Sequence, residues 1–402
     1  AVIVKHSTPL PVMNMMRHLK VPNSDVEGAF TKLKENNWLA SNMLIFASEN
    51  GKNRLIPLNN DAPEMPNNLL KYREVNCKGK IDNRVNPNWL NHLKKTIDNE
   101  IIEKYDELWP ASHEFIGDMM IVRIDEEIIQ FSSKIAKAKL DAHPKLRLIL
   151  SDQGVFGELR IRELIPIGVR NNNQIILENI PLELCKTKVI VKESGREIIC
   201  DPSIAYFSSK LQTERQETLY FAKKLKKILG RPINICDPFC GVGPAVSSLL
   251  NEPNLTHNIL ASDLNPEAVN ILFENLSKWD KRKYPESSGN IDWMYPNRLV
   301  GVADATVVAK NKNYIGKWDL LMINLPHKTL ELLPYLLPLI DNNSPSLIRG
   351  RIIIEESKIE YTNKILHEIL PDLLPGSKSL SLKIKRDYSA KLRLCSFEAW
   401  LA

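Results

Sequence analysis

Short apolar runs alternate with longer amphipathic segments through the second half of the chain. The runs at 233–235, 259–261 and 319–323 predict buried strands, and apolar residues recur at helical spacing in 208–229, 245–250, 267–279 and 330–340. This alternation is typical of a parallel sheet with helices packed on it. Two last stretches, 379–385 and 392–401, predict a hairpin at an edge of that sheet. We therefore predict an α/β domain over residues 208–402.

The beginning of the chain has a different pattern. Ser24 and Glu27 stand at capping-box spacing before a short amphipathic helix, and the stretches 43–46 and 54–58 predict paired strands. Residues 59–68 are rich in proline and asparagine, which predicts a linker. We expect a small N-terminal domain over residues 1–60.

The intervening residues, 69–207, mix the two periodicities. They predict buried strands at 114–122 and 146–150, a helix at 126–140, and a hairpin formed by 189–191 and 197–200. Residues 157–165 alternate apolar and charged side chains, so Arg160 and Arg162 should share the polar face of a half-buried strand. These elements predict an α+β middle domain.

The stretch from Cys236 to Pro244 predicts a ligand site. A strand that ends on Asp237, turns through Gly241 and Gly243 and enters a helix lets bare backbone approach a nucleotide-like ligand. Asp263 follows the next apolar run, where doubly wound folds place a carboxylate on ribose hydroxyls, and Asp304 is a candidate acceptor for an adenine amino group. The third glycine of the dinucleotide fingerprint is missing, which favours a mononucleoside such as S-adenosylmethionine over NAD. The alternative is that these aspartates only end strands and cap helices.

Composition narrows the class of protein. The 402 residues are 43% hydrophobic and 25% charged, as in ordinary globular proteins, and long enough for two or three domains. The net charge of +6 permits a phosphate-bearing partner through the basic clusters at 223–227, 281–283 and 383–386, although such clusters also occur as solvated faces. The six cysteines include no C-x-x-C pair, so we expect reduced thiols and no metal site. No apolar run reaches the ~18 residues of a membrane span and no secretory segment opens the chain, so we expect a soluble cytoplasmic protein.

An ordered set of motifs extends over almost the whole chain. Its members are Val21-Pro22, Gly157-Glu158-Leu159-Arg160, Tyr206-Phe207-Ser208 through Glu214-Arg215, Asp237 to Pro244, Ser262-Asp263-Leu264-Asn265-Pro266 and Asn324-Leu325-Pro326. The set resembles the archaeal and eukaryotic tRNA (guanine-37-N1)-methyltransferases. The resemblance implies a class I (Rossmann-like) S-adenosylmethionine methyltransferase domain with smaller α+β N-terminal domains. It also implies that tRNA is bound at its anticodon loop and its outer corner.

The same resemblance assigns roles to individual residues. Glu214 is implied as the base at guanine N1, Arg160 as the cation that stabilises charge on O6, and Asn324 as a catalytic contact at the end of the fourth strand. The implied target contacts are Tyr206, which would stack on the guanine, Pro326, Arg162 and Lys210, which stands where the family often has arginine. The implied cofactor contacts are Asp237, Phe239, Gly241, Val242, Gly243, Asp263, Leu264, Asp304 and Asn324.

Two other functions stay open. One is a wyosine-pathway transferase that moves a methyl or aminocarboxypropyl group to modified guanine 37. Of these two groups, the motif Asn324 to Pro326 favours transfer of the methyl group. The other is a non-catalytic RNA-binding protein on a methyltransferase fold. An amino-group methyltransferase is disfavoured, because its Asn/Asp-Pro-Pro-aromatic motif is absent. We expect a monomer.

Overall fold

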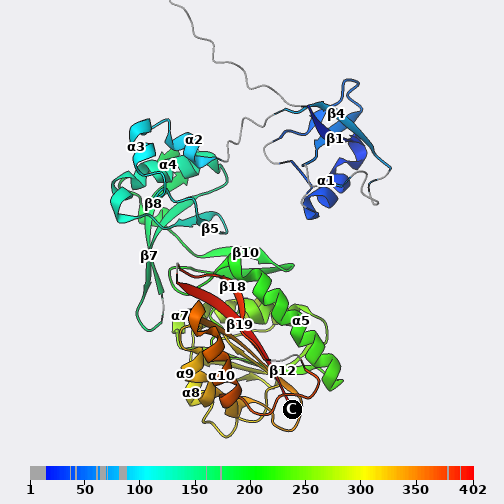
Figure 1. Ribbon diagram of the computed structural model, residues 1–402, viewed down its shortest axis with the longest axis vertical. Coiled ribbons are helices and arrows are strands. Elements are labelled where there is room, and N and C mark those ends of the chain that lie inside the picture. The colour runs from blue at the N-terminus through cyan, green and yellow to red at the C-terminus, as the bar shows by residue number, and fades with distance from the viewer. Residues whose placement is uncertain are drawn as a thin grey trace, which may run out of the picture. The chain divides into compact units, whose positions relative to one another are not determined.

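The structure is a computed structural model, shown in Figure 1, and describes residues 15–36, 38–40, 43–59, 62–63, 69, 71–80, 88–159, 161–172, 174–377, 380–389 and 391–402. The chain divides into two compact units. The first contains the described residues up to 107 together with 131–145, and the second contains 108–130 and 146–402.

A four-stranded antiparallel sheet begins the first unit. Its order is β2 (Phe46–Ala47), β3 (Asn53–Pro57), β1 (Met15–Pro22) and β4 (Arg73–Lys78). The expected amphipathic helix is α1 (Val26–Glu35), which buries Ala29 and Leu33 in one cluster with Val21 of β1. The sheet includes β4, so this module continues past the expected boundary at residue 60. The three-domain division itself stays a prediction.

Ser24 does not act as a helix cap. It lies in a 3-10 turn, η1 (Asn23–Asp25), and its hydroxyl donates to Asp25 rather than accepting from the helix. The capping-box prediction was therefore wrong in its contacts, although the helix itself follows directly after that turn.

Three short helices complete the first unit: α2 (Trp89–Leu93), α3 (Asn99–Lys104) and α4 (Ser132–Ala142). The helix predicted at 126–140 is split, because residues 126–131 form a 3-10 turn, η3 (Glu126–Phe131), before α4. Lys139 of α4 is fully buried with its ammonium 3.9 Å from the centre of the Trp89 ring, and burial lowers the pKa of Lys139 to about 7.

The second unit contains a five-stranded sheet with the order β5 (His113–Ile116), β6 (Met119–Val122), β7 (Leu148–Phe156), β8 (Ile161–Asn171) and β9 (Gln174–Ile176). The single strand predicted at 114–122 is a hairpin instead. Gly117 adopts a left-handed φ of +60° and turns the chain, so β5 and β6 pair antiparallel. Residues 157–159 form the turn between β7 and β8, so the strand predicted from residue 157 begins later, at Ile161. Arg160 lies outside the described residues.

A second hairpin and a long helix connect the two sheets of this unit. The hairpin is β10 (Val189–Glu193) with β11 (Arg196–Cys200), as predicted, and η4 (Leu182–Leu184) precedes it. The helix α5 (Gln212–Leu229) follows a 3-10 turn, η5 (Ser209–Leu211). Ser209 does not cap α5, and its hydroxyl donates to the Phe115 carbonyl of β5.

The larger sheet has eight strands in the order β14 (Asp292–Tyr295), β15 (Arg298–Val302), β13 (Thr256–Asp263), β12 (Ile233–Asp237), β16 (Leu320–Ile323), β17 (Ser346–Glu355), β19 (Leu392–Leu401) and β18 (Lys383–Asp387). The five strands from β15 to β17 are parallel. The predicted final hairpin, β18 with β19, is antiparallel and lies at one edge. Strand order reverses between β12 and β16, where doubly wound sheets bind ligands at the carboxyl ends.

Successive residues of the central strands point to opposite faces of this sheet. Leu260 and Leu321 pack with α8 (Ala305–Val308), α9 (Thr329–Leu336) and α10 (Ile359–Ile369), while Ile259 and Leu320 pack on the other side with α5, α6 (Pro244–Asn251) and α7 (Pro266–Asp280). Figure 1 shows the sheet between these two layers. The 3-10 turns η6 (Leu337–Leu339) and η7 (Glu356–Lys358) follow α9 and precede α10. None of the described helices is both long and apolar enough to cross a membrane.

Candidate functional site

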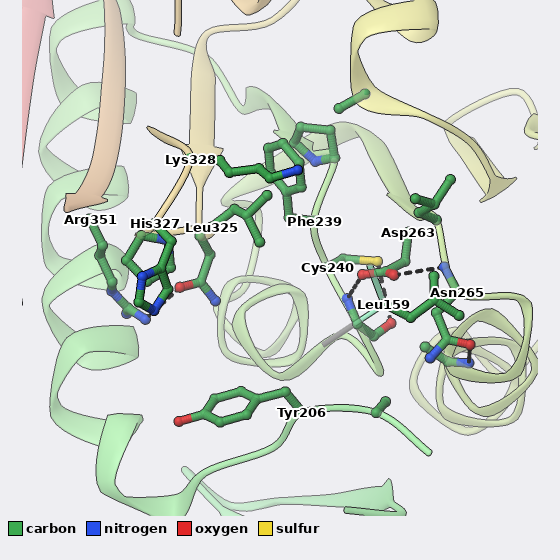
Figure 2. Close-up of a pocket in the computed structure, with 18 of the residues that line it drawn as sticks. Leu159, Tyr206, Phe239, Cys240, Asp263, Asn265, Leu325, His327, Lys328 and Arg351 are labelled. Atoms are coloured by element: carbon green, nitrogen blue, oxygen red, sulfur yellow. Dashed lines mark hydrogen bonds between the residues drawn. The ribbon is translucent and has the colours of Figure 1, made fainter. Parts of the chain in front are cut away.

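A cavity of about 310 Å³ opens at the carboxyl ends of the parallel strands. Part of its lining comes from the segments at the carboxyl ends of β12, β13, β15 and β16. The rest includes residues of the strands β17, β18 and β19 and of the turn between β7 and β8. Figure 2 shows Arg351 and His327 across this cavity from Asp263 and Asn265. Residues on or directly after seven strands of one sheet therefore meet where the sequence predicted a ligand.

The glycine loop forms one wall of the cavity through Phe239 and Gly241. Gly241 and Gly243 have left-handed φ values of +53° and +84°, which glycine adopts without strain. A Cβ on Gly243 would lie 2.6 Å from Cδ1 of Leu272, so this position also needs glycine for packing. Val242 is fully buried in a hydrophobic cluster. Val242 and Gly243 shape the loop, but neither lines the described cavity.

Asp263 lies at the end of β13 and ties the glycine loop to its own strand. Its Oδ2 accepts from the Gly241 backbone N–H over 2.8 Å and its Oδ1 accepts from Asn265 N over 2.9 Å. Burial raises the pKa of Asp263, and these backbone donors oppose that effect. Leu264 beside it is exposed and lines the cavity. The carboxylate is placed to meet a polar ligand group such as a ribose hydroxyl.

Asp304 follows β15 and combines two of the roles considered for it. Its side chain caps α8 by accepting from Thr306 N over 2.7 Å, and it also lines the cavity. Hydrogen bonding from the Thr306 side chain lowers the pKa of Asp304. The carboxylate is therefore available as an acceptor at the rim of the cavity.

Asp237 has a buried carboxylate oxygen for which the described residues supply no donor. It is 3% exposed, and its Oδ1 has no hydrogen-bond partner among them. Burial raises the pKa of Asp237 to about 7, against a hydrogen bond from the Phe239 backbone. It lines a second cavity of about 40 Å³, which shares Asn324 and Arg351 with the larger one. A buried acceptor without a donor is what a hydrogen-bonding ligand would satisfy.

Asn324 and Arg351 lie together at the centre of the site. Asn324 follows β16, and its Oδ1 accepts from Nη1 of Arg351, on β17, over 2.8 Å. Burial lowers the pKa of Arg351 to about 10, against the favourable charge of Glu214. An arginine at that value is still protonated at neutral pH. The Asn324 amide must present its oxygen to the guanidinium, which leaves its NH₂ group to donate.

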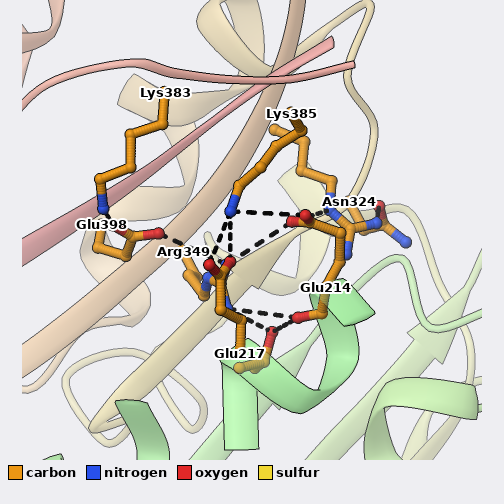
Figure 3. A network of polar contacts seen from close by, with 9 residues as sticks. Glu214, Glu217, Asn324, Arg349, Lys383, Lys385 and Glu398 are labelled. Atoms are coloured by element: carbon orange, nitrogen blue, oxygen red, sulfur yellow. Dashed lines mark hydrogen bonds and ion pairs between the residues drawn. The ribbon is translucent and has the colours of Figure 1, made fainter. Parts of the chain in front are cut away.

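Glu214 belongs to a buried cluster of charges, which Figure 3 shows. Its carboxylate lies 3.5 Å from Nζ of Lys385, 3.7 Å from Nη2 of Arg349 and 3.9 Å from Nε of Arg351. Glu217 and Glu398 neutralise part of this positive charge, at 2.6 Å and 3.5 Å from Arg349. Oε2 of Glu214 accepts no hydrogen bond from the described residues. Glu214 does not itself line either cavity. Arg351, which lies beside Glu214, lines both of them.

Tyr206 and Arg162 form a stacked pair. The Arg162 guanidinium lies 4.8 Å from the centre of the Tyr206 ring, and Nη1 donates to Glu114 over 3.0 Å. Glu114 also accepts from the Ser208 hydroxyl. The Tyr206 side chain lines the cavity and is 43% exposed, whereas Arg162 does not line it. Arg162 therefore supports the ring from behind rather than facing a ligand.

The structure brings most of the predicted residues to one place. Those that line the larger cavity are Tyr206, Phe239, Gly241, Asp263, Leu264, Asp304, Asn324 and Pro326. Lys210 is exposed on η5 and does not line it. Arg160 cannot be placed because it lies outside the described residues. The individual roles of all these residues stay predictions.

Sequence reasoning did not single out several polar residues of the cavity. Arg351, His327, Lys328 and Tyr388 all line it, and His327 and Tyr388 contact each other with 3.2 Å between Nε2 and the hydroxyl oxygen. Lys328 follows the Asn-Leu-Pro motif closely enough for the motif to have indicated it. Arg351 lies inside a mostly apolar strand together with Arg349, and charges within a buried strand were the signal available there.

Comparisons with known proteins fit this geometry. Residues 93–167 match a family model described as the TYW2 N-terminal domain. The chain is 30% identical over 168 residues to the tRNA (guanine(37)-N(1))-methyltransferase Trm5b of Pyrococcus abyssi, covering 42% of this chain and 44% of that protein. It is 24% identical over 213 residues to a tRNA (guanine(37)-N(1))-methyltransferase of Paramecium tetraurelia, covering 53% and 46%. The matched stretches thus span less than half the length of these curated relatives.

Solved structures agree on the architecture. The crystal structure of Trm5b from Pyrococcus abyssi superposes with a TM-score of 0.58 at 21% identity, over 96% of this chain and all of that one. The structure of aTrm5 in complex with tRNALeu gives the same TM-score at 20% identity, over 96% and 99%. The predicted α/β class I methyltransferase fold is confirmed, and the chain is similar in sequence and in fold to the tRNA (guanine-37-N1)-methyltransferases, as its motifs indicated.

Proposed function

We propose that this protein transfers the methyl group of S-adenosylmethionine to N1 of guanine 37 in tRNA. The observation that carries the proposal is the meeting of the glycine loop, Asp263 and Asn324-Leu325-Pro326 in one cavity. The named activity of the similar proteins from Pyrococcus abyssi and Paramecium tetraurelia supports the choice of reaction and substrate.

The residues around the glycine loop fit a nucleoside cofactor. Asp263 would accept from the ribose hydroxyls, Asp304 from the adenine amino group, and Phe239 and Leu264 would cover the apolar faces. Asp237, with its unpartnered Oδ1, would accept from the amino end of the same molecule. When bound, S-adenosylmethionine would supply its sulfonium methyl group: the deprotonated N1 bonds to the methyl carbon, the carbon–sulfur bond breaks, and the neutral thioether S-adenosylhomocysteine leaves.

The remaining residues would activate the guanine. Its N1 carries a proton, so transfer needs a base at N1 and a positive charge near O6. In this proposal Glu214 takes the N1 proton, and Arg160 compensates the charge on O6. The NH₂ group of Asn324, oriented by Arg351, donates to the guanine, and Tyr206 stacks on the guanine ring. Because Arg351 lies between Glu214 and the cavity, a shift of the Arg351 side chain would accompany guanine entry.

We also propose how the protein meets its substrate. The anticodon loop enters the cavity of the second unit, and the N-terminal module binds the outer corner of tRNA. The solved complex of a similarly folded protein with tRNALeu supports a tRNA partner. The free state of all six cysteines supports a reducing compartment such as the cytoplasm. The proposed monomer is tested by sedimentation with and without tRNA.

One observation favours a second candidate. The match of residues 93–167 to the TYW2 N-terminal domain supports a transferase that acts on modified guanine 37. Such an enzyme would move a methyl or an aminocarboxypropyl group. Asn324 to Pro326 in the cavity favour methyl transfer.

The test uses S-adenosylmethionine labelled either in its methyl or in its aminocarboxypropyl group. It is incubated with tRNA transcripts that carry G or A at position 37 and, in parallel, with cellular tRNA that carries modified guanine 37, and the nucleosides are then analysed. We expect methyl label in N1-methylguanine from the G37 transcript alone. Aminocarboxypropyl label in tRNA would favour the second candidate. Binding of tRNA without either label would favour a non-catalytic protein.

A further inference from the structure

Two cations that line the larger cavity pair with no carboxylate in the described part of the chain. Lys328 lies in the loop between β16 and α9, and Arg386 lies on β18. Neither side chain forms an ion pair or a hydrogen bond with another described residue. A cation in a concave site, and arginine above all, is well suited to an anionic ligand.

Arg386 differs from the two lysines of its own strand, because each of those lysines has a carboxylate partner. Lys383 of the same strand pairs with Glu398 at 2.5 Å, and Lys385 pairs with Glu217 at 2.6 Å. Two of the three cations in this basic cluster therefore have carboxylate partners inside the protein. The third, Arg386, faces the cavity and has none among the described residues.

Acidic and basic residues of the cavity come from strands on opposite sides of β12. The carboxylates Asp263 and Asp304 follow β13 and β15, on one side of β12. Lys328 and Arg386 come from β16 and β18, on the other side, where Asn324 also lies. The acidic side suits the hydroxyl and amino groups of a nucleoside, and the basic side suits a polyanion. The two free cations thus come from strands on the side assigned above to the target base, and the Lys328 side chain reaches toward Phe239 (Figure 2).

We propose that Lys328 and Arg386 bind a phosphodiester group of the RNA next to the target nucleotide. This inference rests on the proposed function, because it needs RNA in the cavity. Arg386 offers a planar fork to two phosphate oxygens, and Lys328 adds a point charge. Together they hold the backbone on one side of the base while Tyr206 contacts its ring. The other anion that could reach them is the carboxylate of the cofactor, and the experiment separates the two.

The experiment compares wild-type protein with Lys328→Gln and Arg386→Gln. The affinity for tRNA is measured at several salt concentrations, and that for S-adenosylmethionine by equilibrium binding. Each lost phosphate contact should lower the slope of log affinity against log salt by ~0.7, the value for single-stranded nucleic acid. Arg386→Lys should keep the slope. Lys364→Gln, which removes an exposed charge on α10 away from the cavity, is the control for net charge.

A neutral methylphosphonate at each linkage flanking nucleotide 37 locates the contact. At the linkage that is bound, it should lower the wild-type slope by ~0.7 and leave the slope of a Lys328→Gln/Arg386→Gln double variant unchanged. Equal losses in both proteins at every linkage would overturn the proposal. So would a tenfold loss of cofactor affinity with an unchanged tRNA slope, which would assign the cations to the cofactor carboxylate. If wild-type protein methylates G37 in the labelled-cofactor test described above, either negative result counts against the phosphate contact and not against the proposed function.

Discussion

Arg351 donates from Nη1 to Oδ1 of Asn324 over 2.8 Å, and its Nε lies 3.9 Å from the Glu214 carboxylate. One guanidinium therefore connects the proposed base to the proposed target contact. The hydrogen bond fixes which end of the Asn324 amide faces the cavity. This makes Arg351 a positioning residue for the reaction.

Arg351→Lys should slow single-turnover methyl transfer about tenfold or more, because lysine keeps the charge but loses the planar fork that orients Asn324. Cofactor affinity should change little. Asn324→Ala should add little to that loss, since both changes remove the same oriented amide. A double-mutant cycle on the single-turnover rate measures the coupling, and fully additive effects would show that Arg351 does not act through Asn324.

Glu214→Gln should slow the chemical step by ~10²-fold or more and leave cofactor affinity nearly unchanged, as expected when a general base is removed. Single-turnover kinetics with saturating cofactor measure this step. Glu217→Gln is a matched control in the same charge cluster. Its carboxylate pairs with Arg349 and Lys385 and does not approach Arg351 within ion-pair distance. Equal slowing by the two variants would mean that the cluster only maintains the fold.

Tyr206→Ala should weaken tRNA binding about tenfold or more, because stacking of one base on an aromatic ring contributes ~1–3 kcal/mol. Tyr206→Phe should bind normally, since it keeps the ring that stacks on Arg162. Titration of tRNA into each variant measures the affinity. A loss in the Phe variant as large as in the Ala variant would assign the effect to the hydroxyl instead of to the ring.

The cofactor side of the site could be predicted from the sequence because its signals are local. The glycine loop, Asp263 and Asp304 each follow an apolar run directly, and strand ends of one parallel sheet meet at one edge. The hairpin of β5 and β6 was missed because apolar residues continue across the turn at Gly117, which pattern alone reads as one strand.

The target side depends on contacts between residues far apart in sequence. The position of Arg162 in the alternating pattern predicts that it lies on a polar face. Its side chain is instead buried and pairs with Glu114, 48 residues away. Glu214 was assigned a catalytic role by resemblance, and no pattern near it predicts Lys385, Arg349 and Arg351 around its carboxylate. Periodicity reports which face a residue takes but not which distant side chain covers it.

Gly243→Ala should destabilise the protein by roughly 2 kcal/mol or more, because the residue has a φ of +84° and its new Cβ would lie 2.6 Å from Leu272. Gly241→Ala carries a similar left-handed strain, but the nearest atom to its Cβ is 4.0 Å away. It should cost only about 1 kcal/mol. Urea unfolding of the two variants compares them directly. Equal destabilisation would show that Leu272 moves aside without cost.

Asp237 should make stability depend on pH. Burial raises its pKa from 3.8 to about 7, so between these values the folded protein keeps a proton that the unfolded chain releases. Stability from this group is therefore lost as pH rises from about 4 to about 7, by up to roughly 4 kcal/mol at ~1.4 kcal/mol per pKa unit. Asp237→Asn cannot ionise and should escape this loss.

The measurement is the free energy of unfolding in urea at pH 5 and pH 8 for wild type, Asp237→Asn and Asp304→Asn. Asp237→Asn should gain stability relative to wild type as the pH rises. Asp304→Asn is the control, and its difference from wild type should stay nearly constant between pH 5 and pH 8, because hydrogen bonding from Thr306 lowers the pKa of Asp304 and the stability from its carboxylate is lost only below about pH 4. If the difference between Asp237→Asn and wild type stays constant from pH 5 to pH 8, the Asp237 carboxyl is already ionised in the folded protein at pH 5. Its charge would then be compensated by Arg351, the nearest cation that favours the ionised form.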